Sequence, residues 1–197
     1  MNLENYFWYF KSVIPLNICD DICKYGKQLQ DQIAVTGGYQ VKKLNKKQIK
    51  NFKKKRNSDI VWMSDRWIYN EIHPYIHEAN KSAGWNFNWD FSESCQFTKY
   101  KKGQYYGWHC DSWEKPYDIP QNTNSHGKIR KLSVTVTLSD PKDYKGGELE
   151  FDFRNMDPDK KRNVHKCKEI LPKGSLVVFP GFVWHRVCPV KKGERNS

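Results

Sequence analysis

The spacing of apolar residues changes once along this 197-residue chain, and the change constrains the fold more than any other feature. Before about residue 85 apolar residues recur every three or four positions, which is typical of helices that bury one face. From residue 87 they alternate with polar residues, as in strands with one buried face. The predicted strands are Phe87–Phe91, Leu132–Leu138, Leu149–Phe153, Ser175–Phe179 and Val183–Val187, with a Pro180-Gly181 turn between the last two.

Two helices are expected in the first part of the chain. After Pro15, Asn17 can cap a helix that runs to about Leu29. A second helical pattern extends from Ile68 to Ala83. Pro74 lies inside it and predicts a kink or a break, because proline has no N–H to donate.

Helices followed by many short strands predict an α+β fold. A double-stranded β-helix, or jelly roll, with the N-terminal helices packed on one face, satisfies this order. The length and apolar content suit one domain. We therefore expect a single domain over residues 1–197, with helical support at about 15–85 and the jelly-roll core at about 86–197.

The formal net charge of +12 is unevenly distributed. The basic run 42–56 holds nine Lys and Arg residues and no acid, and without it the chain carries only +3. Such a run is usually a solvated loop or helix face. Direct binding of nucleic-acid phosphate or of an acidic substrate through residues 42–56 is the alternative.

The six cysteines form no CxxC pair, so we expect reduced thiols rather than a disulfide framework or a zinc ribbon. No stretch of about 18 apolar residues is present, and the N-terminus does not resemble a signal peptide. We expect a cytoplasmic protein with no membrane partner.

One group of residues indicates a metal site. His109 and Asp111 are two positions apart, so on a strand their side chains emerge on the same face. His185 lies in a distant apolar strand and could supply a third ligand. Two histidines and one carboxylate leave adjacent metal positions open, the arrangement typical of non-haem iron(II) oxygenases.

Several further residues could bind a small molecule beside such a metal. Arg195, ten residues after His185, is a fixed cation that can grip one end of a dicarboxylate with two parallel hydrogen bonds. Tyr100 lies nine residues before His109, and its hydroxyl could reach the same molecule. Ser133, Thr135 and Thr137 carry hydroxyls on one strand face, although each could equally be an ordinary exposed strand residue.

With these motifs the chain resembles the prolyl 4-hydroxylase-like 2-oxoglutarate/iron(II) dioxygenases, in particular small members encoded by marine bacteriophages of the cyanophage type. The resemblance covers about residues 95 to 197. It rests on Tyr100-xx-Gly103-Gln104-x-Tyr106-xx-His109-x-Asp111, Gly146-Gly147-Glu148-Leu149, Lys173 to Pro180, and His185-xxx-Pro189-Val190-xx-Gly193-x-Arg195.

The resemblance implies iron on His109, Asp111 and His185, and 2-oxoglutarate bound to the iron with its far carboxylate on Arg195. Secondary co-substrate contacts fall on the hydroxyl residues Tyr100, Ser133 and Thr137. Dioxygen is the second co-substrate, ascorbate supports turnover, and a phage-encoded protein would act in the host cytoplasm.

The chain departs from this family at two points. The prolyl hydroxylases proper usually carry lysine where Arg195 stands. Relatives continue beyond the position of Ser197 into a further strand, so we expect that the last strand is missing from this sequence.

Three functions remain open from the sequence. The leading hypothesis is hydroxylation of a protein or peptide at proline, because the ten-residue spacing from His185 to Arg195 resembles that of the prolyl hydroxylases. The alternatives are a nucleic-acid-directed 2-oxoglutarate oxygenase, favoured by the basic run, and a non-catalytic jelly-roll binding module.

Overall fold

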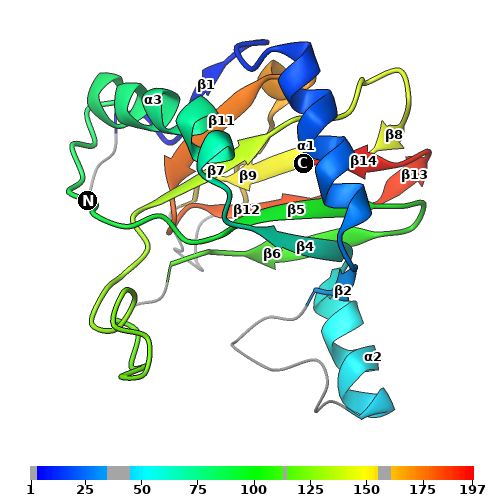
Figure 1. Cartoon of the computed structure of the whole chain (residues 1–197), viewed down its shortest axis with the longest axis horizontal. Coiled ribbons are helices and arrows are strands. Elements are labelled where there is room, and N and C mark those ends of the chain that lie inside the picture. Colours follow the sequence, from blue (N-terminus) through cyan, green and yellow to red (C-terminus); the bar gives the residue numbers. More distant parts are fainter. Residues whose placement is uncertain (1–3, 35–44, 113–114, 155–160) are drawn as a thin grey trace.

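The computed structural model describes residues 4–34, 45–112, 115–154 and 161–197 (Figure 1). Its helices are α1 (Leu16–Gln28), α2 (Lys46–Lys55), α3 (Arg66–Ser82) and a short 3-10 helix (Lys168–Ile170). Its strands are β1 (Trp8–Phe10), β2 (Gln32–Ile33), β3 (Arg56–Asn57), β4 (Asp59–Met63), β5 (Cys95–Tyr100), β6 (Tyr105–His109), β7 (Leu132–Val136), β8 (Lys145–Gly146), β9 (Leu149–Asp152), β10 (Val164–Lys166), β11 (Leu176–Pro180), β12 (Trp184–Val187), β13 (Val190–Lys192) and β14 (Arg195–Asn196).

The strands form antiparallel sheets. One sheet has the order β1-β11-β7 and another the order β14-β5-β4-β2. These two meet where the Leu138 N–H donates to the Asn196 carbonyl at 3.1 Å, so together they form one wall. The facing wall has the order β10-β9-β12-β6-β3, and β13 pairs with β8.

A hydrophobic core fills the space between the two walls. In β11, Val177 and Phe179 point into this core, whereas Leu176 and Val178 belong to a second core on the opposite face. Phe179 meets Phe151 of the facing wall edge-on, with ring centroids 5.0 Å apart. Two antiparallel sheets packed in this way form the predicted jelly roll.

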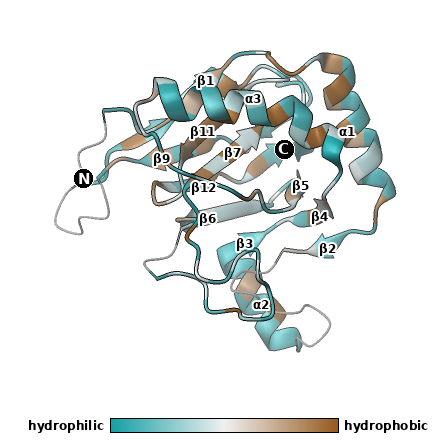
Figure 2. Cartoon of the chain, turned by 60° about the vertical axis from the view of Figure 1, so that its left-hand side comes forward, coloured by the Kyte–Doolittle hydropathy of each residue, from teal (hydrophilic) through white to brown (hydrophobic). Residues whose placement is uncertain are grey.

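The second core lies between the first wall and the helices. Buried residues of α1 and α3, including Ile22, Ile68 and Ile72, pack there against Phe97 of β5. Figure 2 shows apolar stretches in β7 and β11 beneath α3. The predicted covering of one face by N-terminal helices is confirmed for α1 and α3.

Two details of the helix predictions need comment. The helix α1 begins at Leu16 with Pro15 as its N-cap, so the prediction that Asn17 caps it is wrong: Asn17 lies inside its first turn. Of the kink or break predicted at Pro74, the break is absent, because α3 continues through Pro74 as one helix, and the kink stays a prediction. Because α3 buries Ile residues on both sides of Pro74, packing compensates for the missing backbone hydrogen bond.

The strand predicted at Phe87–Phe91 is absent, and residues 87–94 are irregular. The backbone N–H and carbonyl of Phe87 pair with the side-chain amide of Asn80 rather than with a strand, at 3.0 and 2.9 Å. Strands also occur before residue 86, where none was predicted: β1 pairs with β11, and β4 pairs with β5.

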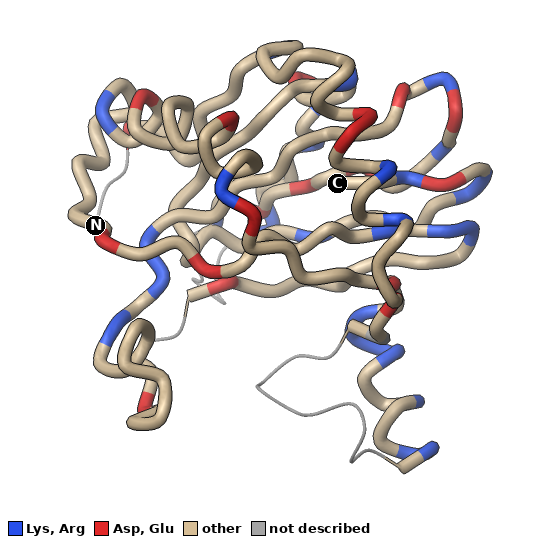
Figure 3. Tube along the Cα trace, in the orientation of Figure 1, with Lys and Arg blue, Asp and Glu red and all other residues tan. Residues whose placement is uncertain are grey.

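The described part of the basic run forms α2, with a capping box between Asn45 and Gln48, while residues 42–44 lie outside the described residues. The helix projects away from the sheets, and its lysines follow one another along it (Figures 1 and 3). Its six lysines, 46, 47, 50, 53, 54 and 55, are all exposed. Arg56 differs from them, since it begins β3 and is only 6% exposed.

All six cysteines are free thiols, as predicted. Within the described ranges, no helix has both the length and the apolar character that crossing a membrane requires.

The packing of α1 on β5 predicts a destabilising substitution at Gly26. A Cβ atom there would lie 2.4 Å from the Phe97 ring, which is 1% exposed and has no room to move. We expect Gly26→Ala to lower the free energy of unfolding by about 1–3 kcal/mol, because overpacking outweighs the better helix propensity of alanine. Urea denaturation measures this, with Lys24→Ala, exposed on the same helix, as the control. Equal or greater stability of Gly26→Ala would contradict the packing.

Candidate metal centre

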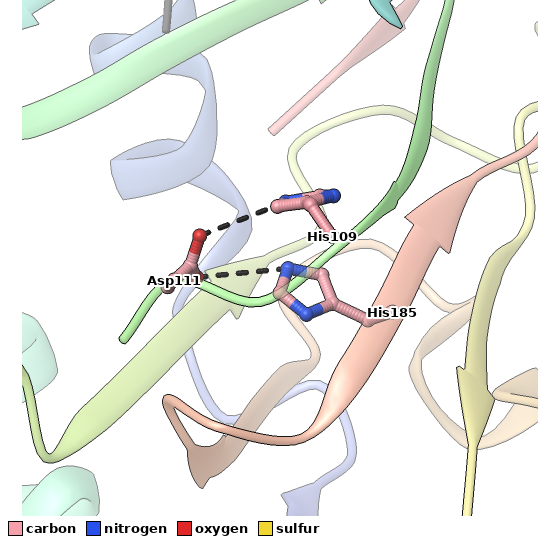
Figure 4. A group of neighbouring side chains, drawn as sticks. All are labelled: His109, Asp111 and His185. Atoms are coloured by element: carbon pink, nitrogen blue, oxygen red, sulfur yellow. Dashed lines mark ion pairs between the residues drawn. The ribbon is translucent and has the colours of Figure 1, made fainter. Parts of the chain in front are cut away.

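Two histidines face each other across neighbouring strands. In the pairing of β6 with β12, His109 lies directly opposite His185, and the register shifts between His185 and Val187. Their ring centroids are 4.1 Å apart. Figure 4 shows both rings directed toward Asp111.

Backbone carbonyls fix the tautomer of both rings. The Nδ1 atom of His109 lies 2.8 Å from the Gly107 carbonyl, and Nδ1 of His185 lies 2.9 Å from the Val183 carbonyl. A carbonyl can only accept, so each Nδ1 carries the hydrogen. Each Nε2 therefore keeps a free lone pair for a metal.

Asp111 reaches the histidines from a turn rather than from a strand. The strand β6 ends at His109, so the prediction that both residues lie on one strand is wrong. The backbone N–H groups of Asp111 and Ser112 both donate to the Gly181 carbonyl at 2.9 Å. This contact turns the chain so that Asp111 still converges with His109.

The Asp111 carboxylate lies between the two rings. Its Oδ1 is 3.6 Å from Nε2 of His109, and its Oδ2 is 3.6 Å from Nε2 of His185. The Ser133 hydroxyl donates to Oδ2 at 2.7 Å. Burial alone would raise the pKa of Asp111, but the two histidines and Ser133 outweigh burial and lower it.

A half-exposed ion pair supports the backbone of Asp111. Arg130 donates to both carboxylate oxygens of Glu93, at 2.5 and 2.6 Å, and its Nη1 donates to the Asp111 carbonyl at 3.2 Å. The turn that carries Asp111 is thus held from two sides, by Arg130 and by Gly181.

His109 is covered by an aromatic ring. The Tyr106 ring stacks on it with centroids 3.5 Å apart and 15° between the planes. Burial raises the pKa of Tyr106 to about 12, so its phenol is protonated at neutral pH. Burial, with His185 alongside, lowers the pKa of His109, which keeps the imidazole neutral and available as a ligand.

These three side chains can hold a metal ion. One ligand atom from each of His109, Asp111 and His185 lies within 4.8 Å of the others, and this is the only such group found among the described residues. Two neutral imidazoles and one carboxylate match the facial set of non-haem iron(II) sites. The donors present therefore fit iron(II).

Arg195 is a buried cation for which the described residues provide no anionic partner. It is 2% exposed, and in the part of the chain that the structure describes it forms no ion pair. Its Nη1 donates to the Ser197 hydroxyl at 3.1 Å, and its guanidinium lies 5.5 Å from the centroid of the Tyr100 ring. A buried guanidinium without a carboxylate is unfavourable, so this residue fits one end of a dicarboxylate.

The predicted hydroxyl residues differ in their surroundings. Tyr100 is 3% exposed and lies opposite Arg195 in the β5–β14 pair. Ser133 contacts Asp111, as described above, whereas the Thr137 hydroxyl donates to the Ile170 carbonyl at 2.7 Å. Whether Tyr100, Ser133 and Thr137 contact a co-substrate stays a prediction.

The site defines a mononuclear metal centre of the two-histidine, one-carboxylate kind in a jelly roll. Residues 95–197 match the model of the 2OG-Fe(II) oxygenase superfamily. The chain belongs to this superfamily. The superfamily is named for Fe(II) and 2-oxoglutarate, and the donor set present here fits Fe(II).

Related sequences include PKHD-type hydroxylases. A PKHD-type hydroxylase of Pseudoalteromonas atlantica is 37% identical over 103 residues, which are 52% of this chain and 39% of that protein. Another from Synechococcus sp. is 37% identical over 94 residues, covering 47% and 33%. The aligned region spans less than half the length of these relatives.

Solved structures show the same fold. A viral collagen prolyl hydroxylase from Paramecium Bursaria Chlorella virus-1, in complex with 2OG, aligns with a TM-score of 0.62 at 21% identity, over 98% of this chain and 93% of that one. A Pseudomonas putida prolyl-4-hydroxylase also gives 0.62, at 18% identity, over 98% and 89%.

The geometry predicts that Asp111→Ala greatly weakens metal binding. This substitution removes the anionic ligand and leaves two neutral imidazoles. Iron(II) titration under anaerobic conditions measures the affinity. His126→Ala, at an exposed loop histidine, is the control and should bind iron like the parent. Full iron affinity in Asp111→Ala would refute the site.

Proposed function

We propose that this protein is a 2-oxoglutarate- and Fe(II)-dependent dioxygenase that hydroxylates a protein or peptide at proline. His109, Asp111 and His185 hold the iron, and Arg195 binds the far carboxylate of 2-oxoglutarate. The observation that carries the proposal is the convergence of these three ligands in one fold with a buried arginine that has no described carboxylate partner.

The chain's own residues prepare the site for this chemistry. The carbonyls of Gly107 and Val183 hold the imidazole tautomers, and Ser133 with Arg130 holds Asp111. When bound, the iron with 2-oxoglutarate and dioxygen supplies the oxidation of a C–H bond. We further propose that Tyr100, Ser133 and Thr137 assist co-substrate binding and that ascorbate supports turnover.

A pocket reaches the candidate metal centre at Asp111, although neither His109 nor His185 lines it. Its volume is about 660 Å³, and its lining includes Asp111 and Ser133. Trp89 and Tyr117 contribute aromatic surface to the same lining, and Arg130 contributes a cation. Pockets of this size and composition are typical of ligand sites.

Structural neighbours favour a polypeptide as the substrate. They include the viral collagen prolyl hydroxylase and a Trichoplax adhaerens prolyl hydroxylase bound to a peptide fragment, the latter with a TM-score of 0.56 at 16% identity. At such identities the likeness concerns the fold, so proline as the target residue is our inference.

A nucleic-acid substrate is the second candidate. The observation that favours it is the helix α2, whose six lysines are all exposed. Their attraction to phosphate is strongly salt-dependent and weakly specific, so it could give binding without any bearing on catalysis.

Replacement of Arg195 by Ala should raise the 2-oxoglutarate requirement sharply, because the co-substrate loses a charge-assisted pair in a buried site. Iron affinity should be spared, and Arg195→Lys should be partly tolerated. Titration with 2-oxoglutarate of the iron-loaded protein measures this, with Lys192→Ala, an exposed cation nearby in sequence, as the control. Unchanged affinity in Arg195→Ala would identify another cation as the anchor.

Incubation with iron(II), ascorbate and 2-oxoglutarate should add one oxygen to a proline-containing peptide and none to an oligonucleotide. Mass spectrometry of both substrate sets measures this, with Asp111→Ala as the inactive control. Oxidation of a methylated oligonucleotide, with every proline-containing peptide ignored, would replace the peptide proposal by the nucleic-acid one.

The triple variant Lys53→Gln, Lys54→Gln, Lys55→Gln separates DNA binding from catalysis in the same assay. It removes three exposed charges of α2 and leaves the buried Arg56 in place. It should weaken any DNA binding while succinate formation with a proline-rich peptide stays nearly unchanged.

A further inference from the structure

The last residue of the basic run lies in the protein interior. Arg56 is 6% exposed, and its Nε donates to the Ser58 hydroxyl at 3.0 Å. Its Nη2 donates to the side-chain carbonyl of Gln96. Among the described residues it forms no ion pair, so its charge is not neutralised by a carboxylate.

The guanidinium of Arg56 lies over the ring of Tyr106, with 4.4 Å between its central carbon and the ring centroid. The ring of His109 is stacked on Tyr106 at 3.5 Å. Two groups this close to one centroid cannot share a face of the ring without overlap. Tyr106 is therefore enclosed between Arg56 on one face and His109 on the other.

This order is electrostatically favourable. The face of an aromatic ring carries negative potential and attracts a cation. An imidazole that ligates a metal is itself electron-poor, so both neighbours of Tyr106 are attracted to its faces. The two hydrogen bonds to Ser58 and Gln96 hold the guanidinium plane in place.

The backbone supports the same arrangement. Arg56 pairs directly with Tyr106 between β3 and β6. The Tyr105 hydroxyl donates to the carbonyls of Lys53 and Lys54, at 3.2 and 3.0 Å, which ties the end of α2 to β6. Arg56 is thus anchored on both sides and cannot swing into solvent with the lysines.

We propose that Arg56 is a positioning residue for the metal centre: it holds Tyr106 against His109 and so fixes the ring plane of this ligand. The inference rests on the proposed role of His109 as a ligand. Tyr106 and His109 are three residues apart on β6, and the Gly107 carbonyl fixes the Nδ1 side of the imidazole. The stack restricts the remaining freedom, rotation of the imidazole ring about its Cβ–Cγ bond.

Cobalt(II) binding to the parent protein and its variants tests this without turnover. Cobalt(II) suits an N/O ligand set, and its visible spectrum reports ligand geometry. Arg56→Met should weaken cobalt(II) affinity about tenfold, the low end of the loss when a direct partner of a ligating histidine is removed, because Arg56 acts on His109 through Tyr106, and should alter the spectrum. Arg56→Lys should fall between parent and Arg56→Met, because it keeps the cation but loses the planar fork.

Lys53→Met is the matched control, since it removes the same charge three residues away, from an exposed side chain. It should bind cobalt(II) like the parent. Parent-like affinity and spectrum in folded Arg56→Met would overturn the inference, even if the variant melts at a lower temperature, because Arg56 would then serve packing alone.

Tyr106 gives a second route if Arg56→Met does not fold. Tyr106→Phe keeps the ring and should bind cobalt(II) like the parent, whereas Tyr106→Leu removes the stack and should weaken binding. Equal affinity of these two variants would overturn the inference. Loss of the metal assignment itself is distinguishable, because Asp111→Ala would then bind cobalt(II) as well as the parent does.

Discussion

The antiparallel register that places His109 opposite His185 is the constraint on which the site depends. Because side chains alternate along a strand, a slip of one residue would turn His185 out of the barrel. The same register brings the Gly181 turn beside the end of β6, where its carbonyl accepts from Asp111 and Ser112. A single pairing of two strands therefore brings the three candidate ligands together, and backbone carbonyls orient both imidazole rings.

Two buried arginines distinguish this interior from an ordinary core. Arg56 and Arg195 are 6% and 2% exposed, and neither forms an ion pair in the described ranges. A buried guanidinium that lacks a carboxylate partner lowers the stability of the fold, so a role other than stability, such as binding or positioning, is expected for both arginines. Each lies over a tyrosine, Tyr106 and Tyr100 respectively, which supplies part of the missing negative potential.

The sequence predicted the fold and the convergence of the three candidate ligands because both rest on patterns that tertiary packing does not override. The metal-site pattern consists of a histidine and an aspartate two positions apart and a distant histidine in an apolar strand. This pattern can be recognised in the sequence without knowing the conformation of the turns between them. The prediction of a strand at Phe87–Phe91 is wrong because the side chain of Asn80, and not a neighbouring strand, forms the backbone hydrogen bonds of Phe87. No periodicity reveals such a contact between a helix and the segment after it. The break that Pro74 could have caused is absent as well, since the burial of α3 outweighs the loss of one backbone hydrogen bond.

The position of Arg56 could not be predicted either, since a run of like charges gives no sign that its last member is buried. Arg56 is buried, unlike the lysines before it, because α2 ends at Lys55 and Arg56 begins the strand β3, where it pairs with Tyr106 of β6. The two kinds of charge then respond differently to salt. At an ionic strength near 0.15 M the field of the exposed α2 lysines decays over about 8 Å, whereas a guanidinium packed on a ring is screened much less. Salt therefore weakens the attraction of anions to the α2 lysines but leaves the contact between Arg56 and Tyr106 in place. The net charge of +12 consequently says little about the electrostatic field at the candidate metal centre.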